Sequence, residues 1–270
     1  AKESRHAAIA LHQTNRGASS ARNHAFRASK GRFIQYLDAD DLIAPNKLAL
    51  QIASLEAHDE SINASAWGRF DKNPEWTEFV PVPEPSLLTA SEYLRRHLAE
   101  GLMTHPAAFV VRRDLIERAG GFREDLSLND DGEFFARLIA AAGRIRFIPD
   151  ARSHYRSNLR NSYSARRTLA SLRSAATAMI ATADIASSID GSERMRRAQG
   201  QGLARVAAYL APHNRAIAEA TMAEANARWP DSAWTEGTRT FRWFAPWVGW
   251  LLARRMEFHV ANLRKLLAPR

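Results

Sequence analysis

Apolar and polar residues are patterned along the first part of the chain as expected of alternating strands and helices. Short apolar runs predict strands at residues 7–12, 33–37, 106–111 and 144–149. Apolar residues at helical spacing predict helices at 18–29, 45–58, 91–100, 114–119 and 133–142. This alternation is typical of the α/β class, and we expect the polar ends of the strands to share one edge of the sheet.

Two details of this pattern can be compared directly with a structure. In the helix expected at 45–58, Leu48, Ile52 and Leu55 share one face, which should pack on the core. Residues 63–85 show scattered aromatic side chains among turn-forming residues, and we expect a loop with short strands there.

The texture changes after residue 164, where strand signals stop and Ala, Arg, Leu and Met dominate. Two or three helices are expected through Trp229, followed by a linker at 230–237. We therefore divide the chain into an α/β part at 1–164, a helical region at 165–238 and a basic, aromatic tail at 239–270.

Composition narrows the class of protein. The chain has 270 residues, of which 46% are hydrophobic and 25% charged, as in ordinary globular domains. It has no cysteine, which excludes disulfides, thiolate metal sites and cysteine nucleophiles. The net charge of +9 favours anionic partners such as nucleotide phosphates, nucleic acid or acidic lipid headgroups. No nucleic-acid-binding motif accompanies that charge, so we expect no nucleic-acid partner.

No membrane-spanning or secretory segment is evident. The start of the chain lacks an apolar segment behind a basic one. The longest largely apolar run, 243–253, is interrupted by Pro246 and Gly249 and is too short to cross a bilayer. We expect the protein to lie in the cytoplasm, either free or at the inner face of the membrane.

Candidate chemistry begins at Asp38-Ala39-Asp40-Asp41, which directly follows the predicted strand at 33–37. Aspartates often cap helices, but three carboxylates at the end of a buried strand repel one another and resist desolvation. A divalent cation with oxygen ligands would neutralise them. Asp38, Asp40 and Asp41 are therefore predicted metal-site residues.

Two further segments flank this cluster. Asn15 to Asn23 joins the first predicted strand to the next helix, and its Arg22 can face a phosphate or the carboxylates themselves. Asn129-Asp130-Asp131 precedes the helix at 133–142. Taken alone, the first is a helix start with a solvated arginine, and the second is either a helix cap or a catalytic acid pair.

Together the segments N-R-G-x-x-x-A-R-N and G-R-F-I-x-x-L-D-A-D-D resemble the family-2 glycosyltransferases. The similarity continues through G-G-F-R-E-D-L at 120–126 and the D-D and R-L pairs at 130–138, and covers about residues 7–160. It implies a GT-A-like (Rossmann-like) mixed sheet, followed here by an α-helical carboxy-terminal region. It also implies a peripheral enzyme of cell-envelope polysaccharide synthesis.

The resemblance also implies residue roles. Asp38 and Asp40 would form the D-x-D motif that binds Mn²⁺ or Mg²⁺ and the diphosphate of a nucleotide sugar. Asp40 would be the direct ligand and Asp41 an adjacent support. Asp131 would be the general base toward the acceptor, with Asp130 in place of the usual Glu. Arg22 would contact the donor phosphate.

The resemblance starts in the middle of the family pattern, so we expect an amino-terminally truncated domain without the portion that supplies the nucleotide-base pocket. It also departs from the family at Tyr155-Arg156-Ser157-Asn158, where Asn158 stands in place of a histidine. The nearby His154 is expected to be a surface or packing residue.

The function implied is transfer of a sugar, with inversion, from a nucleotide-diphosphate sugar to a saccharide or lipid-linked acceptor hydroxyl. One alternative is a catalytically incomplete fragment that acts as a binding or membrane-associated module. A haloacid-dehalogenase-type phosphatase fits less well, since Leu42 stands where that class has Thr or Val. The tail at 239–270 fits either peripheral membrane contact or packing on the catalytic domain.

Overall fold

The computed structural model describes residues 8–157, 167–230, 249–253, 256 and 259–260. Its helices in this range are α1 (Ala18–Ala28), α2 (Lys47–Ala57), α3 (Ala90–Glu100), α4 (Arg113–Ala119), α5 (Asp130–Ala142), α6 (Leu169–Ile189), α7 (Glu193–Leu210) and α8 (Arg215–Arg228). Its strands are β1 (Phe33–Ile34), β2 (Leu42–Ile43), β3 (Ile62–Phe70), β4 (Glu78–Phe79), β5 (Leu87–Thr89), β6 (Phe109–Arg112) and β7 (Arg144–Arg156).

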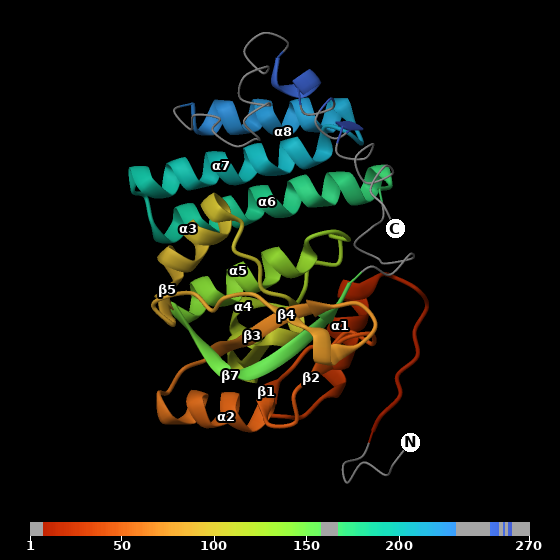
Figure 1. The fold of residues 1–270 in the computed structure, drawn as a ribbon, viewed down its shortest axis with the longest axis vertical. Coiled ribbons are helices and arrows are strands. Elements are labelled where there is room, and N and C mark those ends of the chain that lie inside the picture. The colour runs from red at the N-terminus through yellow and green to blue at the C-terminus, as the bar shows by residue number, and fades with distance from the viewer. Residues whose placement is uncertain (1–7, 158–166, 231–248, 254–255, 257–258, 261–270) are drawn as a thin grey trace.

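The strands form one mixed sheet. Its main path runs β1-β6-β3-β7-β2, with β4 added beside β3 and β5 beside β7. Only the central pair, β3 and β7, is parallel, and the other described pairs are antiparallel. Helix α2 lies on one side of the sheet, and α3 and α5 lie on the other (Figure 1). The predicted α/β class with a mixed sheet is confirmed.

A loop with short strands was expected at 63–85. The central strand β3 shows that this prediction was wrong for residues 63–70, whereas residues 71–85 do form a loop with the short strand β4. Polar residues inside β3 disguise it, but each has a partner within the core. The Asn63 side chain donates to Gln51 O over 2.8 Å, and Ser65 Oγ lies 3.0 Å from Ser153 Oγ on β7. Because these buried polar groups are hydrogen-bonded, they can stand in a strand that is almost entirely buried.

Helix α2 forms as predicted and buries Leu55 as expected, but its inward face is rotated from the one predicted. It buries Lys47, Gln51 and Leu55, whereas Leu48 is 37% exposed. Lys47 is fully buried, and its Nζ donates to Gln35 Oε1 over 2.5 Å. The polar side chains on this face have partners inside the fold, because Lys47 donates to Gln35 and Gln51 donates to Ala108 O. Hydrogen bonds of this kind allow a face with Lys47 and Gln51 to be buried in place of an apolar one.

At the β1 edge of the sheet, two strand predictions need correction. Residues 8–12 form no strand within the described chain, and Ile9 is 73% exposed. Among the described strands β1 pairs with β6 on one side only, so residues 8–12 do not extend the sheet beyond its β1 edge. The strand expected at 33–37 is limited to Phe33–Ile34.

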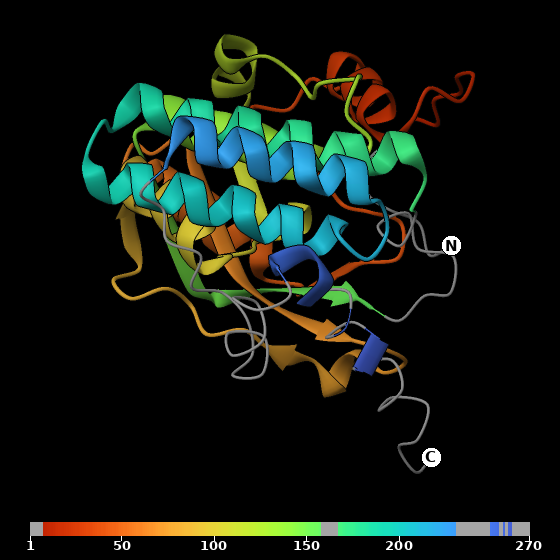
Figure 2. The same ribbon diagram turned by 90° about the horizontal axis from the view of Figure 1, so that it is seen from above.

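The helices α6, α7 and α8 lie side by side beyond α5 (Figures 1 and 2), which confirms the helical carboxy-terminal region. Their apolar side chains join the core of the α/β part, because Met179, Ala183 and Met195 belong to the same buried cluster as Phe134 and Leu138. The boundaries predicted at residues 164 and 238 lie outside the described residues.

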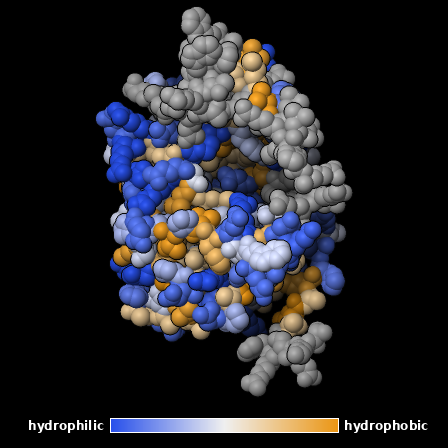
Figure 3. Space-filling view, viewed as in Figure 1, coloured by the Kyte–Doolittle hydropathy of each residue, from blue (hydrophilic) through white to orange (hydrophobic). Residues whose placement is uncertain are grey.

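The outer surface gives no sign of a bilayer-spanning element in the described ranges. No described helix combines the length and apolarity that crossing a bilayer requires. On the face shown in Figure 3, hydrophilic side chains predominate and apolar ones are interspersed among them. The tail at 239–270 lies mostly outside the described residues.

Candidate active site

Arg22 on α1 joins the two acidic motifs of the sequence. Its Nη2 lies 2.9 Å from Asp38 Oδ1, and its Nη1 lies 3.0 Å from Asp130 Oδ2. Asp38 follows β1 in the chain, and Asp130 opens α5. One guanidinium therefore bridges carboxylates that are 92 residues apart in the sequence (130 − 38).

The bridge is recessed. The Arg22 side chain is 17% exposed and that of Asp130 is 10% exposed, while Asp38 opens to solvent at 42%. Burial disfavours the charge of Arg22, but Asp38 and Asp130 outweigh burial, so the pKa of Arg22 lies above its ordinary value. Ser19, one turn earlier on α1, donates its hydroxyl to Asp130 Oδ2 over 2.8 Å.

The remaining acids of the cluster differ sharply in environment. Asp40 is exposed, whereas the Asp41 side chain is 1% exposed. Asp41 Oδ1 accepts from the backbone N–H of Arg156 at 2.9 Å, and its Oδ2 lies 3.3 Å from His105 Nδ1. Both Asp41 oxygens therefore have protein partners, and Asp41 anchors the turn to β7.

This anchor continues into the centre of the sheet. His105 Nε2 lies 2.8 Å from Ser153 Oγ, which in turn lies 3.0 Å from Ser65 Oγ on β3. His105, Ser153 and Ser65 are fully buried. This chain of hydrogen bonds fixes the turn at Asp38–Asp41, called the D-x-D turn below, to the two parallel strands β3 and β7.

Asp131, the predicted base, lies in the wall of a cavity of about 340 Å³ between the α/β part and the helical layer. The cavity is lined mainly by apolar and aromatic side chains, among them Tyr93, Met103, Phe135, Tyr155, Met179, Val206 and Tyr209. Burial, followed by repulsion from Asp130, raises the pKa of Asp131 to about 6. Asp38 adds a smaller repulsion, and Arg22 opposes the rise.

A second contact ties α1 to the loop ahead of α5. The Asn23 side-chain amide donates to Phe122 O over 2.8 Å, and its oxygen accepts from Phe122 N, also over 2.8 Å. A Cβ on Gly121 would lie 2.5 Å from Asn23 Oδ1, so this close approach requires glycine. Arg137 on α5 donates to the carbonyls of residues 119, 120 and 121.

Sequence reasoning missed several residues of this region. Ser19 stands three residues before Arg22, so helical spacing could have placed both on one face. His105 gave no such signal, because its partners lie far away in the chain. Arg156 belongs to the segment noted at 155–158, but its bond to Asp41 was not expected. Asn158, which replaces the histidine of the family pattern, lies outside the described residues. His154 packs against Phe79 and bonds to Thr77, as expected.

The carboxylates of Asp38 and Asp40 suit a hard divalent cation whose other coordination positions are filled by a bound ligand and water. No cluster of three or more His, Cys, Asp or Glu in a metal-binding arrangement occurs in the described ranges. Mg²⁺ is commonly held by one or two carboxylates together with substrate phosphates and water, rather than by an all-protein cage. The exposed Asp40 and the half-open Asp38 fit that requirement, whereas Asp41 is already occupied by protein groups.

Known proteins share this sequence in part. Residues 1–120 match the pattern of Glycosyl transferase family 2. The glycosyltransferase EpsJ of Bacillus subtilis is 27% identical over 157 residues, covering 55% of this chain and 44% of its own length. The succinoglycan biosynthesis protein ExoU of Rhizobium meliloti is 27% identical over 150 residues, covering 50% of this chain and 42% of its own. The chain thus spans less than half the length of these relatives.

The fold has solved counterparts. S. aureus TarS, residues 1–349, superposes with a TM-score of 0.63 at 16% identity, over 94% of this chain and 74% of TarS. The likeness defines an α/β protein with a GT-A-like fold and a helical carboxy-terminal region. The sequence matches show that residues 1–120 are similar to Glycosyl transferase family 2, and the superposition on TarS shows the fold that goes with this similarity.

Proposed function

We propose that this protein transfers a sugar from a nucleotide-diphosphate sugar to an acceptor hydroxyl, with inversion at the anomeric carbon. The observation that carries the proposal is the Arg22 bridge, with Nη distances of 2.9 Å to Asp38 and 3.0 Å to Asp130. It brings the D-x-D turn and the start of α5 into one site. Donor phosphate chemistry and acceptor activation would then take place side by side.

Asp131 suits the role of general base. A carboxylate with a pKa of about 6 is largely ionised at neutral pH, yet it is a better proton acceptor than an ordinary aspartate. As the acceptor oxygen attacks the anomeric carbon, its proton passes to Asp131. The bond between that carbon and the phosphate oxygen breaks, and its electron pair leaves with the nucleoside diphosphate.

Asp38 and Asp40 would hold the divalent metal, Mn²⁺ or Mg²⁺. When bound, such an ion supplies positive charge that stabilises the leaving diphosphate. Arg22 Nη2 contacts both Asp38 oxygens, at 2.9 and 3.3 Å, but the Asp38 side chain is 42% exposed, so an ion could still approach this carboxylate from solvent. Asp41 would support the turn rather than bind the ion, because its side chain is 1% exposed and both of its oxygens contact groups inside the fold.

The relatives support the choice of partners. TarS was crystallised in complex with UDP-GlcNAc, and ExoU is a succinoglycan biosynthesis protein. We therefore propose a nucleotide-sugar donor and a saccharide or lipid-linked acceptor for this protein. The mainly apolar cavity beside Asp131 would receive the acceptor, since a carbohydrate ring or a lipid-linked group offers apolar surface to such a wall.

Donor binding and turnover can be tested separately. UDP-glucose, UDP-galactose, UDP-GlcNAc and GDP-mannose are titrated calorimetrically with Mn²⁺ or with EDTA, and nucleoside diphosphate release is measured in parallel. We expect metal-dependent binding of at least one donor. This binding should be lost in Asp40→Ala and retained in Asp131→Asn, which should release diphosphate about 10²–10⁴-fold more slowly. The exposed Asp150 provides a control, and Asp150→Ala should behave as wild type.

Four results would count against the proposal. Unchanged binding in Asp40→Ala would remove the metal assignment, and normal turnover in Asp131→Asn would remove the base. Absence of binding for all four donors would favour a binding or membrane-associated module. Retention of the donor sugar's anomeric configuration in the product, read by NMR, would contradict inversion.

We also propose peripheral membrane contact through residues 239–270. The support is compositional, since this segment combines Trp and Phe with an excess of Arg and Lys. Cosedimentation with vesicles of phosphatidylcholine and phosphatidylglycerol should deplete the protein from solution. Pure phosphatidylcholine vesicles should deplete it less, and equal depletion would exclude an electrostatic contribution from the basic residues.

A further inference from the structure

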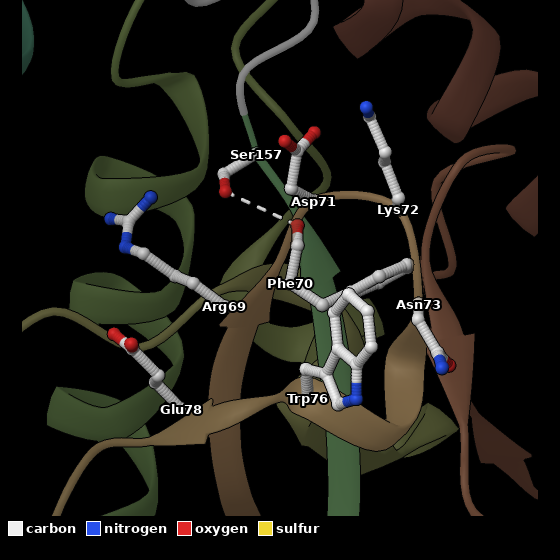
Figure 4. A pocket seen from close by; sticks show the side chains of 8 residues that line it. All are labelled: Arg69, Phe70, Asp71, Lys72, Asn73, Trp76, Glu78 and Ser157. Atoms are coloured by element: carbon white, nitrogen blue, oxygen red, sulfur yellow. Dashed lines mark hydrogen bonds between the residues drawn. The ribbon is translucent and has the colours of Figure 1, made fainter. Parts of the chain in front are cut away.

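A groove of about 540 Å³ opens where β3 and β7 end, next to the D-x-D turn. Figure 4 shows its lining side chains, which are Arg69, Phe70, Asp71, Lys72, Asn73, Trp76, Glu78 and Ser157. Arg156 separates the groove from the turn, because its Nε donates to Asp40 O over 2.9 Å and its Nη1 to Asp71 O over 3.2 Å. The groove therefore lies next to the candidate active site, with Arg156 between them, and none of the acidic residues assigned to that site lines it.

The groove presents an unusually exposed tryptophan. Trp76 is 75% exposed, although an indole is one of the most apolar side chains a surface can carry. It ends the short 3₁₀ turn η1 (Pro74–Trp76), whose first residue is preceded by Asn73. Asn73 Oδ1 accepts from Glu75 N over 3.0 Å, which fixes the start of the turn.

The turn is held against the sheet, so the exposure of Trp76 is built into the fold. Strand β4 approaches β3 so closely that a Cβ on Gly68 would lie 2.5 Å from Glu78 O. Thr77 Oγ1, directly after Trp76, lies 2.7 Å from His154 Nδ1 on β7. Together these contacts fix the hairpin that carries the indole.

The positive and negative side chains that line the groove are equal in number, and several of them can still form hydrogen bonds to a ligand. Arg69 and Lys72 are offset by Asp71 and Glu78. In the part of the chain that the structure describes, Asp71, Lys72 and Glu78 form no ion pair. Arg69 is held over the rings of Trp67 and Tyr155, 5.5 and 5.1 Å from their centroids.

We propose that this groove is a binding subsite for a neutral saccharide. A pyranose ring has an apolar face of C–H groups that can stack on an indole, while its hydroxyls project outward as donors and acceptors. Trp76 supplies the platform, and Asn73, Asp71 and Glu78 can bond the hydroxyls. Because the charges cancel, the groove does not select an anionic ligand. As a subsite for the acceptor chain, it rests on the proposed function.

The experiment measures saccharide binding without donor or metal. Cellohexaose, chitohexaose and maltohexaose are each titrated and followed by saturation-transfer NMR. We expect at least one to bind with a dissociation constant on the order of millimolar. Trp76→Ala should weaken binding by about tenfold or more, and Trp76→Phe by less. Ile189→Ala, a change at an exposed apolar residue at the end of α6, should leave binding unchanged.

Several results would overturn the proposal. These are no binding of any of the three sugars at 20 mM (roughly the weakest affinity worth assigning), equal binding by Trp76→Ala, or competition by inorganic phosphate. Phosphate competition would mark an anion site instead. Sugar binding that survives while donor binding fails would show that the subsite stands even if the transferase assignment falls.

Discussion

Asn23 and Phe122 are joined by a pair of reciprocal hydrogen bonds, each 2.8 Å long, between the side-chain amide of one and both backbone polar groups of the other. The pair links α1 to the loop that leads into α5. Arg22 is the neighbour of Asn23 on α1, and Asp130 opens α5 at the end of the loop, so the link helps to hold these two groups near each other.

Removing this amide should destabilise the protein. Asn23→Ala leaves the buried N–H and C=O of Phe122 without partners, and we expect the free energy of unfolding to fall by about 2–4 kcal/mol. Urea denaturation measures the change. Asn46→Ala is the matched control, because Asn46 precedes α2 without a side-chain capping bond. A loss under about 0.5 kcal/mol in Asn23→Ala would show that water replaces the amide.

Arg22→Lys tests the bridge between the two acidic motifs. A lysine retains the charge but cannot place two donors on Asp38 and Asp130 at once. We expect kcat/KM to fall on the order of tenfold to a hundredfold, because Asp38 and α5 lose their shared partner. Steady-state kinetics with the best donor measures this. Arg27→Lys, at an exposed position of the same helix, should change little, and equal effects would refute the bridge.

Asp131→Asn should separate stability from activity. The pKa of Asp131 is raised to about 6 in the folded protein, above its ordinary value of 3.8. The folded state therefore binds this proton more tightly, so the carboxyl lowers stability increasingly as pH rises from about 4 to 6, and fully above that. Removing it should stabilise the protein at pH 7.5 by about 1–2 kcal/mol. Turnover should fall by about 10²–10⁴-fold.

Unfolding of both proteins at pH 4, 5, 6 and 7.5 checks the sign. The stability difference should grow between pH 4 and 6 and then level off. In the wild type, kcat/KM should rise through the same window as the base ionises. A constant difference across the series would mean that Asp131 has an ordinary pKa.

Lys47 offers a prediction independent of function. Burial lowers its pKa to about 7, whereas an unfolded lysine titrates near 10.5. The unfolded state binds more protons between these values, so stability should rise with pH from about 7 to 10. Lys47→Met should remove this rise and stabilise the protein at pH 7 by about 2–3 kcal/mol. Lys30→Met, at an exposed position, should do neither, and a lower stability for Lys47→Met would show that its bond to Gln35 matters more.

The sequence suggested the solvent-exposed residues of the candidate site, but not the buried contacts that support them. Asp38 and Asp40 were proposed as site residues because charge follows an apolar run abruptly, which is a signal local to the sequence. Their role stays a prediction. The expectation that Arg22 could face the carboxylates agrees with the contacts observed. The burial of Asp41 could not be anticipated, because it depends on His105 and β7, which come far later in the chain.

The same distinction explains the errors in the fold. Strand β3 was missed because Asn63 and Ser65 look like loop residues until Gln51 and Ser153 are placed opposite them. The inward face of α2 was misjudged because a lysine and a glutamine fill the interior there. In both cases polar groups are buried in pairs, and a periodic pattern of apolar residues cannot reveal such pairs.

The apolar cluster shared by the sheet and the helices α6 and α7 has a consequence for how this chain can be divided. Trp229 lies in the same cluster as Ile62 and Phe109, so shortening the chain after β7 would uncover the apolar surface that α3 and α5 turn toward the helices. Such a piece would be prone to aggregate. The sheet and the helices are therefore expected to fold and unfold together as one cooperative unit.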